Sequence, residues 1–570
     1  MRPAGRAQYQ SLYFDYPSYD FVRPPQMDGA SEGPPVAIVG AGPVGLVAAL
    51  ELARYAIPSV VLDEKHTVND GSRAVCLARH SMEQLQQLGI ADTFTSKALG
   101  WTHGSSYFRG QCVYRLEMPH SGHERFLPMY NLQQQYMEQY LADAARQHPL
   151  IDVRFASRVV DIVSDDESVG LTVATPAGSY PLHTTYCLAA DGAHSTVRRR
   201  AGLPLKGDAY EGRYVIADIQ LRSDFPTERR AFFDPPANPG ATLLMHKQPD
   251  DIWRVDWQLR PGEDETAALE ETALRRKIGA ILAMVGEDGP WELEWWSIYR
   301  AFTLCLDDYR HGGIFFLGDA AHLVPIFGVR GLNSGLADAG NIAWKLAAVL
   351  NGSAPAQLLD SYTPERRGAT MDVFANARKS TQFMTPPTVG YQLMRDAVLS
   401  LSLRYAFARP FLNPRQSAPY NYDQSALTSF LGRDKAFTAG PAAGAPLIDH
   451  RLADGSFLLD YLPNGFFVLA FCRDRSAIAE WKGLPGKISS ALASAHPLTV
   501  LIVCAKSRAP NSDMVLNDAD GGCHHRYGAG DGSCYLVRPD RHVAARWQSL
   551  NLAELRSAFQ WALSIQGTLR

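Results

Sequence analysis

The sequence has few of the features that mark a secreted, metal-binding or nucleic-acid-binding protein. Its eight cysteines are scattered over 570 residues, without a C-x-x-C pair or the spacing of metal ligands. This pattern argues against a disulfide framework and a zinc site, and we expect no metal centre. Cys523 and Cys534 are close enough in sequence to pair, but we expect two free thiols. A formal net charge of -4 gives no reason to expect a nucleic-acid partner.

Long hydrophobic runs are also absent. The most apolar window, from Val36 to Leu50, is too short to cross a bilayer and contains glycine and proline. Residues 1–35 lack the apolar segment of a secretory signal peptide and are rich in Tyr, Pro and Asp, which indicates an extended arm. We therefore expect no membrane association and a cytoplasmic location.

The stretch from Val36 to Asp63 has the pattern of a dinucleotide-binding βαβ unit. An apolar strand is followed by Gly40, Gly42 and Gly45 in the spacing G-x-G-x-x-G. The first glycine allows a tight turn, the second lets the backbone approach a pyrophosphate, and the third lets the following helix pack against the strand. The N-terminus of that helix directs free N–H groups at phosphate oxygens.

An acid ends the second strand of this unit. Asp63 follows the predicted strand Ser59–Leu62, where a carboxylate accepts hydrogen bonds from a ribose 2′-OH. Glu64 is the alternative residue for the same role. An acid at this position favours an adenosine ribose with a free 2′-OH, and therefore FAD or NAD rather than NADP.

Two later motifs each place an aspartate directly after an apolar strand. In the first, Leu188 to Arg199, the strand ends at Asp191. In the second, Phe316 to Leu346, the strand ends at Gly318 and Asp319, where the carboxylate would accept from a ribityl hydroxyl.

A glycine-rich loop, Gly328–Asn333, follows the second of these aspartates and precedes a helix predicted from Gly335 to Leu350. Its backbone N–H groups would suit a phosphate or the C2=O edge of a reduced isoalloxazine.

The three motifs, in this order and spacing, resemble the class A flavoprotein aromatic hydroxylases, the family of p-hydroxybenzoate and phenol hydroxylases. The run G-D-A-A-H-x-x-P…G-x-x-G-L-N-x-G-x-x-D-A is highly specific, and the resemblance extends from Val36 to Phe411. The nearest subgroup is the 3-(3-hydroxyphenyl)propionate hydroxylase-like enzymes, which carry a C-terminal thioredoxin-fold domain. Arg526 to Trp547 is similar to the final hairpin of that domain.

This resemblance implies an α/β fold in three parts. A Rossmann-like FAD-binding domain of the glutathione-reductase type would contain an inserted β-sheet substrate domain, and a thioredoxin-like α/β domain would follow. We expect an N-terminal arm at 1–35, the FAD-binding domain at 36–206 and 297–411, the substrate domain at 207–296, a linker at 412–435, and the thioredoxin-like domain at 436–570.

The resemblance also implies which residues contact FAD. Besides the three motifs, it points to an arginine after the second strand and to a glutamine in a helix predicted from Asn131 to Arg146. The expected FAD-contacting residues are Gly40, Gly42, Pro43, Val44, Gly45, Asp63, Glu64, Arg73, Gln134, Asp191, Gly318, Asp319, Gly331, Leu332 and Asn333.

The reaction implied by the resemblance has two halves. NADH or NADPH binds transiently and reduces FAD, and O₂ then forms a C4a-hydroperoxide that transfers oxygen to a phenolic or other electron-rich aromatic ring. The expected partners are therefore a small aromatic substrate and O₂, and we expect a homodimer. Two alternatives remain: a flavoenzyme of the same fold that performs epoxidation, Baeyer–Villiger oxidation or dehydrogenation, and a flavin-binding redox sensor or interaction protein without turnover.

Candidate catalytic residues lie in the inserted sheet. Arg254 and Asp256 are two apart on one predicted strand, and therefore on one face. Relatives have R-x-Y at this position, with the arginine near the flavin and the tyrosine at the substrate, whereas this chain has Asp256. Asp256 is a candidate base for a phenol proton, and His246 on the neighbouring strand is the rival. An ordinary ion pair for Asp256 and a structural role for His246 remain open.

Overall fold

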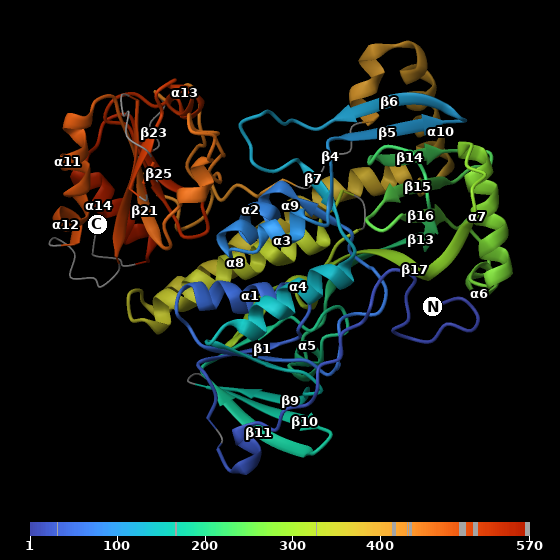
Figure 1. Cartoon of the computed structure of the whole chain (residues 1–570), viewed down its shortest axis with the longest axis horizontal. Helices are drawn as coiled ribbons and strands as arrows, with labels where there is room; N and C mark the ends of the chain where they lie inside the picture. Colours follow the sequence, from blue (N-terminus) through green and yellow to red (C-terminus); the bar gives the residue numbers. More distant parts are fainter. Residues whose placement is uncertain are drawn as a thin grey trace.

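The computed structural model describes the chain except residues 31, 166–167, 326–327, 413–417, 430, 432–435, 490–496, 506–510, 513 and 565–570. For residues 209–211 and 301 we describe the backbone alone. The described chain forms a central α/β domain, a large sheet on one side of it, and a separate C-terminal α/β domain on the other side (Figure 1). In the described part of the chain, every helix is too short or too polar to span a bilayer.

A six-stranded, mostly parallel sheet forms the core of the central domain. Its strand order is β18-β19-β12-β1-β2-β8, and β1 lies between β2 and β12 with parallel pairing on both sides. Parallel neighbours end at the same edge, so the residues that follow β1, β2, β12 and β19 meet there. The strands are β1 (Val36–Val39), β2 (Ser59–Leu62), β8 (Ile151–Arg154), β12 (Tyr186–Ala189), β18 (Arg310–His311) and β19 (Ile314–Phe316).

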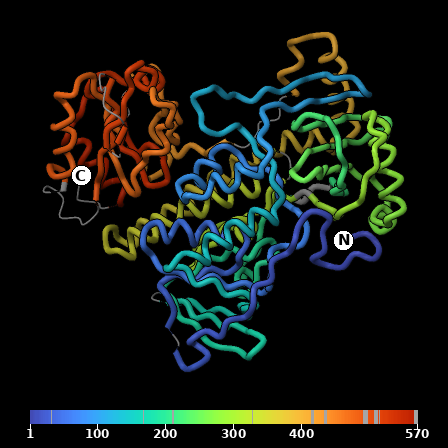
Figure 2. The backbone as a smooth tube through the Cα atoms, viewed as in Figure 1, coloured from blue at the N-terminus to red at the C-terminus, as the bar shows by residue number. Residues whose placement is uncertain are grey.

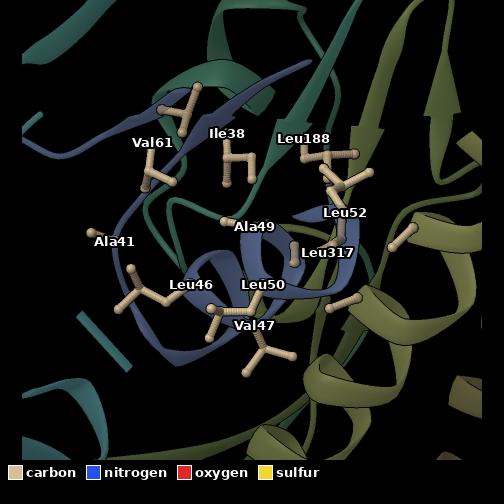
Figure 3. Packing of buried hydrophobic residues seen from close by; sticks show 14 of the residues in the cluster. Ile38, Ala41, Leu46, Val47, Ala49, Leu50, Leu52, Val61, Leu188 and Leu317 are labelled. Atoms are coloured by element: carbon tan, nitrogen blue, oxygen red, sulfur yellow. The ribbon is translucent and has the colours of Figure 1, made fainter. Parts of the chain in front are cut away.

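Helix α1 (Pro43–Arg54) covers one face of this sheet. Its side chains Leu46 and Ala49 belong to the same buried cluster as Ile38, Val61 and Leu188 of the strands (Figure 3). The branched strand residues and the small alanine allow close approach of helix and sheet. Helix α8 (Gly331–Leu350) packs on α1 in turn.

Two small sheets and several helices complete the central domain. They include a three-stranded sheet of β9 (Arg158–Ser164), β10 (Val169–Thr175) and β11 (Gly178–Thr184), and another of β3 (Cys76–Ala78), β7 (Met129–Asn131) and β4 (Leu99–Trp101). The helices are α2 (Arg79–Gln87), α3 (Ala91–Thr95), α4 (Gln134–Gln147), α5 (Thr196–Arg200), α9 (Tyr362–Met384) and α10 (Val389–Arg404), with short 3₁₀ turns at η1 (Pro25–Asp28), η2 (Gly318–Ala320), η3 (Ala356–Ser361) and η4 (Ala406–Leu412).

Two predicted helix starts differ from the structure. Helix α8 begins at Gly331 rather than Gly335, so the end of the predicted loop forms its first turn. Helix α4 begins at Gln134 rather than Asn131, because Met129–Asn131 pairs as β7 with β3 and β4.

An eight-stranded sheet lies beside the central domain, with the strand order β20-β17-β13-β16-β15-β14-β5-β6. The hairpin of β5 and β6 joins it through parallel pairing of β5 with β14, and β17 runs on to Cys305. The sheet therefore extends beyond the 207–296 segment in which we placed the substrate domain. Its strands are β5 (His103–Phe108), β6 (Gln111–Glu117), β13 (Lys206–Leu221), β14 (Arg229–Phe233), β15 (Thr242–Lys247), β16 (Ile252–Gln258), β17 (Trp291–Cys305) and β20 (His322–Leu323).

The two faces of this sheet have different partners. Helix α7 (Glu271–Val285), preceded by the short α6 (Glu265–Ala268), covers one face, and Trp253, Val255 and Trp257 pack against it. The opposite face carries the alternate residues of β16, Arg254 and Asp256.

The C-terminal domain is a five-stranded sheet with the order β23-β22-β21-β24-β25 (Figure 2, orange to red). Strands β21, β22 and β23 are parallel, whereas β24 and β25 are antiparallel to their neighbours. The elements are η5 (Leu458–Tyr461), β21 (Phe466–Cys472), η6 (Arg475–Ala477), α11 (Ile478–Lys482), α12 (Leu484–Ser489), β22 (Leu498–Cys504), β23 (Val515–Asn517), α13 (Gly522–Tyr527), β24 (Cys534–Val537), β25 (Val543–Trp547) and α14 (Leu552–Ala562).

The C-terminal domain shares a hydrophobic core with the central domain. Trp344 of α8 lies edge-on to Phe466 of β21, with ring centroids 5.6 Å apart. All eight cysteines are free thiols, Cys523 and Cys534 among them. The N-terminal arm also ties parts together, since the Met1 amine donates to the Trp296 carbonyl (2.8 Å) and Arg2 pairs with Asp70 (2.7 Å).

Candidate functional site

The glycine turn after β1 has the geometry that its spacing predicts. Gly40 has φ +106°, and a Cβ on Gly45 would lie 2.0 Å from the Gly40 carbonyl oxygen, so the helix approaches the turn too closely for any side chain. A Cβ on Gly42, by contrast, would meet no heavy atom within 4 Å. The open side of Gly42 and the first turn of α1, which begins at Pro43, leave room for a phosphate-bearing ligand.

Asp63 is fastened to this turn. Its carboxylate accepts hydrogen bonds from the backbone N–H groups of Ala41 (2.7 Å) and Lys65 (2.9 Å). Each carboxylate oxygen accepts more than one hydrogen bond, so capacity remains for a ribose hydroxyl. Glu64 is exposed at the next position. Asp63 therefore lies nearer the glycine turn than its rival.

The aspartates of the two later motifs follow neighbouring strands, β12 and β19. Asp191 accepts from the N–H groups of Thr196 (2.6 Å) and Val197 (3.1 Å), while its Oδ1 is buried without a hydrogen-bond partner. Asp319 lies in the turn Gly318–Ala320. Its side chain is accessible to solvent, yet the protein atoms around it partly desolvate the carboxylate and raise its pKa. These features place Asp319 on the wall of a recess.

The first and third motifs pack directly on each other. A Cβ on Gly335 would lie 2.6 Å from a Val44 methyl, and a Cβ on Gly318 would lie 3.2 Å from the same methyl. Glycines at both positions therefore let the turn before α1 and the start of α8 approach. Gly331 and Leu332, in the first turn of α8, are partly exposed.

Asn333 points into the protein. Its Oδ1 accepts from the Ala78 N–H (2.8 Å) and the Ser81 hydroxyl (2.7 Å), and its Nδ2 donates to the Cys76 carbonyl (3.1 Å). Asn333, which we expected to contact FAD, thus uses its side chain to join strand β3 to helix α8.

A buried charge cluster that the sequence analysis did not identify supports this motif. Asp338 accepts from the Gly318 N–H (2.9 Å), from Arg366 (2.6 Å) and from His322, whose Nε2 lies 2.8 Å away. Arg366 and His322 hold the pKa of Asp338 below its usual value although burial opposes this. The aspartate of the G-x-x-G-L-N-x-G-x-x-D-A run was the signal available in the sequence.

The loop that carries Arg73 is held from two sides. Gln134 accepts from the Ala74 N–H (2.9 Å) on one side. On the other, Arg254 donates to the Arg73 carbonyl (2.9 Å) and the Ser72 carbonyl. The Arg73 side chain itself is exposed.

Arg254 is also paired with a carboxylate. It forms a bidentate ion pair with Asp218 of β13, both distances being 2.9 Å, and both side chains are buried. The hydrogen bonds of Arg254 therefore connect the large sheet to the loop that carries Arg73.

Asp256 and His246 lie on the same face of the sheet as Arg254. Asp256 is 5% exposed, and its Oδ1 has no hydrogen-bond partner. Burial raises its pKa to about 7, with the Arg254 charge opposing the rise. Burial lowers the pKa of His246 well below its ordinary value, and the charges of Arg229 and Arg254 add to this. Near pH 7 Asp256 is therefore poised to gain or lose a proton, whereas His246 stays neutral.

A cavity of about 470 Å³ adjoins this face of the sheet. Its wall is mostly apolar and comes from β4, β5, β6, β14, α9, α10 and η4. A second cavity, of about 630 Å³, lies between α2, α8, α9 and the C-terminal domain and includes His80 and Asp540. The smaller cavity borders the sheet face that carries Asp256, and the larger one does not.

The residues present fit a bound FAD. The turn at Gly40 and Gly42 would hold the pyrophosphate and Asp63 the adenosine ribose. The unpartnered oxygen of Asp191 and the recessed carboxylate of Asp319 would accept from hydroxyl groups of the cofactor.

Comparisons with known proteins agree with this geometry. Residues 34–377 match a sequence family described as FAD binding domain. The 3-(3-hydroxy-phenyl)propionate/3-hydroxycinnamic acid hydroxylase 2 of Burkholderia vietnamiensis (strain G4 / LMG 22486) is 27% identical over 546 residues, covering 92% of this chain and 96% of that protein. A 3-(3-hydroxy-phenyl)propionate/3-hydroxycinnamic acid hydroxylase of Mycobacterium sp. (strain JLS) is 26% identical over 535 residues, covering 92% and 91%.

Solved structures share the fold over nearly the whole chain. The flavin-dependent monooxygenase PieE, in complex with FAD and substrate, aligns with a TM-score of 0.77 at 22% identity, covering 94% of this chain and 100% of that chain. Aklavinone-11 hydroxylase, in a ternary complex with FAD and aklavinone, aligns with a TM-score of 0.73 at 23% identity and the same coverage.

Proposed function

The chain belongs to the FAD binding domain family, and on this basis we propose that it is an FAD-dependent monooxygenase. It uses NADH or NADPH and O₂ to hydroxylate a phenolic or other electron-rich aromatic compound. The curated relatives, which match over almost their whole length, act on hydroxylated aromatic acids according to their names. The observation that carries the proposal is a cavity bordering one face of the large sheet. The same face carries the buried, titratable Asp256 and Arg254, which holds the Arg73 loop.

The residues of the chain have three tasks in this reaction. Bound FAD supplies electron transfer from the nicotinamide and activation of O₂. The apolar wall of the 470 Å³ cavity binds the aromatic ring and excludes water. Asp256, with a pKa of about 7, takes the proton of the substrate hydroxyl and so makes the ring more nucleophilic. Arg254, occupied by Asp218 and two carbonyl groups, positions the Arg73 loop.

Three further features belong to the same proposal. The C-terminal domain is thioredoxin-like, which the order β22-β21-β24-β25 and its mixture of parallel and antiparallel pairing support. The enzyme is a cytoplasmic protein, in agreement with eight free thiols. It forms a homodimer, for which the exposed apolar side chains Val389, Leu393 and Phe407 offer a contact surface.

A panel of phenols and phenolic acids tests the main proposal. Purified protein saturated with FAD is mixed with NADH or NADPH, and nicotinamide oxidation is compared with incorporation of ¹⁸O from ¹⁸O₂. We expect a phenol to stimulate oxidation strongly and to appear as a product with one labelled oxygen atom. Stimulation by an olefin with epoxide formation would indicate the alternative chemistry, and slow oxidation that no compound stimulates would contradict the proposal.

A further inference from the structure

The cavity beside the large sheet has an apolar body and a cationic end. Trp101, Phe233, Met384 and Leu412 contribute to its apolar wall. Among the described residues that line it, the charged ones are Arg229 and Lys379, and none is acidic. Lys379 is exposed, whereas Arg229 is 9% exposed, so the buried charge of the cavity is that of Arg229.

The Arg229 guanidinium has no partner among the residues that the structure describes. Its Nε is buried without a hydrogen bond, and no hydrogen bond or ion pair joins its terminal nitrogens to a described residue. Other arginines on this sheet are paired: Arg230 binds Glu228 (3.0 Å), and Arg254 binds Asp218. Burial lowers the pKa of Arg229, but an arginine keeps its proton at any physiological pH.

None of the described groups that face Arg229 forms a hydrogen bond or ion pair with it, although the charge of Asp256 attracts it. On the neighbouring strands, His246 is paired with Arg229, and Arg254 is paired with His246. His246 stays neutral, and Asp218 balances the charge of Arg254. Burial raises the pKa of the Cys76 thiol to about 12, so it is uncharged. Asp256 lies on the same face, two residues after Arg254 on β16, and is about half ionised near pH 7. Asp256 offsets the charge of Arg229 only in part and without a hydrogen bond. A buried guanidinium without a hydrogen-bonded counter-ion is costly, and this position therefore favours an anionic ligand.

We propose that Arg229 binds an anionic oxygen of the aromatic substrate, whose ring occupies the apolar part of the cavity. The substrate is thus an aromatic compound with an acidic oxygen, either a carboxylate or a phenolate, and a hydrophobic body. The inference deepens the proposed function, because it takes this cavity as the substrate site.

The cationic end is also the end that adjoins the flavin motifs. Trp101, which lines the cavity, donates to Asn131 (2.8 Å), and the Cys76 thiol lies 2.9 Å from the same Asn131 oxygen. The Cys76 carbonyl accepts from Asn333 of the third motif. An oxygen held by Arg229 would therefore place the part of the ring that carries it toward the cofactor.

Binding of matched charged and neutral ligands tests the proposal. The FAD-loaded protein is titrated with 3-phenylpropionate and its methyl ester in one arm, and with a phenol and its methyl ether in the other. The readout is the flavin absorption change or calorimetric heat, which needs no turnover. We expect the anionic member of at least one pair to bind about 10- to 100-fold more tightly, as a charge-assisted hydrogen bond would provide.

The two arms distinguish the sources of the oxygen. Preference for 3-phenylpropionate over its ester indicates a carboxylate contact. Preference for the phenol, with affinity rising as pH passes the phenol's own pKa, indicates a phenolate contact. Equal binding within both pairs would overturn the inference, and this comparison on the wild-type protein needs no variant.

Variants connect the preference to Arg229. Arg229→Met should abolish the discrimination while leaving neutral ligands bound, and Arg229→Lys should restore part of it. The matched control is Arg109→Gln, because Arg109 is exposed at the end of β5 and pairs with Asp234 outside the cavity. Discrimination that survives in Arg229→Met would refute the assignment. Tighter binding of the anionic ligands without any hydroxylation would contradict the proposed function but not this inference. Hydroxylation of neutral aromatic compounds without tighter binding of the anionic ligands would contradict this inference but not the proposed function.

Discussion

A buried ion pair joins the C-terminal domain to the central domain, and its removal should destabilise the protein substantially. Arg538, before the turn between β24 and β25, donates to both carboxylate oxygens of Glu365 on α9, with the Nη2–Oε2 distance 2.9 Å. Arg538 also binds Asp540 (2.6 Å), and Lys345 binds Glu365 (2.7 Å). Two cations and two anions are thus balanced where water is excluded.

Arg538→Gln leaves one cation for two buried carboxylates. Removal of one partner from a buried pair costs about 3–5 kcal/mol, because the remaining charge is neither solvated nor compensated. The charges of Arg538 and Lys345 hold the pKa of Glu365 well below its usual value, although burial opposes this. That contribution to stability is present above the unfolded-state pKa of Glu365 and is lost as pH falls through the folded-state pKa. The deficit of the variant should therefore be largest near neutral pH and shrink below about pH 4.5.

Denaturation in urea, followed by far-ultraviolet circular dichroism at pH 7 and pH 4, measures this effect. A double-mutant cycle with Glu365→Gln isolates the pair, because the double variant keeps Lys345 and Asp540 in balance and should lose less stability than the two single variants together. Arg475→Gln is the control, since Arg475 is exposed in the same domain and should change stability by less than about 0.5 kcal/mol. An unchanged unfolding midpoint in Arg538→Gln, or strict additivity in the cycle, would refute the reasoning.

Two other predictions concern the site itself. In Asp256→Asn, hydroxylation should fall by about 10²-fold or more while flavin reduction persists and peroxide is released; the wild-type rate should rise as pH passes about 7, and the variant should lack that limb. Because burial raises the folded-state pKa of Asp256, this group destabilises the fold as pH rises from about 4 to 7. Relative to the wild-type protein, the variant should therefore gain stability over that range. If nicotinamide oxidation in the variant yielded as much hydroxylated product as in the wild-type protein, Asp256 would not be part of the mechanism. Gly45→Ala should lower the stability of the apoprotein, since its Cβ would lie 2.0 Å from a carbonyl oxygen, whereas Gly42→Ala should spare apoprotein stability and weaken FAD binding. Thermal melts and FAD titrations measure both glycine variants, and equal behaviour of the two would contradict the roles assigned to them.

The sequence by itself determined the βαβ unit and the positions of its acids. The strands at Val36–Val39 and Ser59–Leu62, the glycine spacing between them and the acid Asp63 after the second strand are local features. These properties depend on residues within a few positions of one another, so periodicity and turn chemistry are sufficient to predict them.

The tertiary structure decided which charges are paired. The sequence places Arg254 and Asp256 on one face of a strand. It does not predict that Arg254 pairs with Asp218, or that one carboxylate oxygen of Asp256 has no hydrogen-bond partner. Nor does it predict that Asn333 turns toward β3, or that the hairpin at 103–117 joins a sheet built mainly from residues 206–305. Asp218 and Arg254 are 36 residues apart, and the other contacts join segments more than a hundred residues apart. Packing of the whole chain selects them among many partners of similar local chemistry.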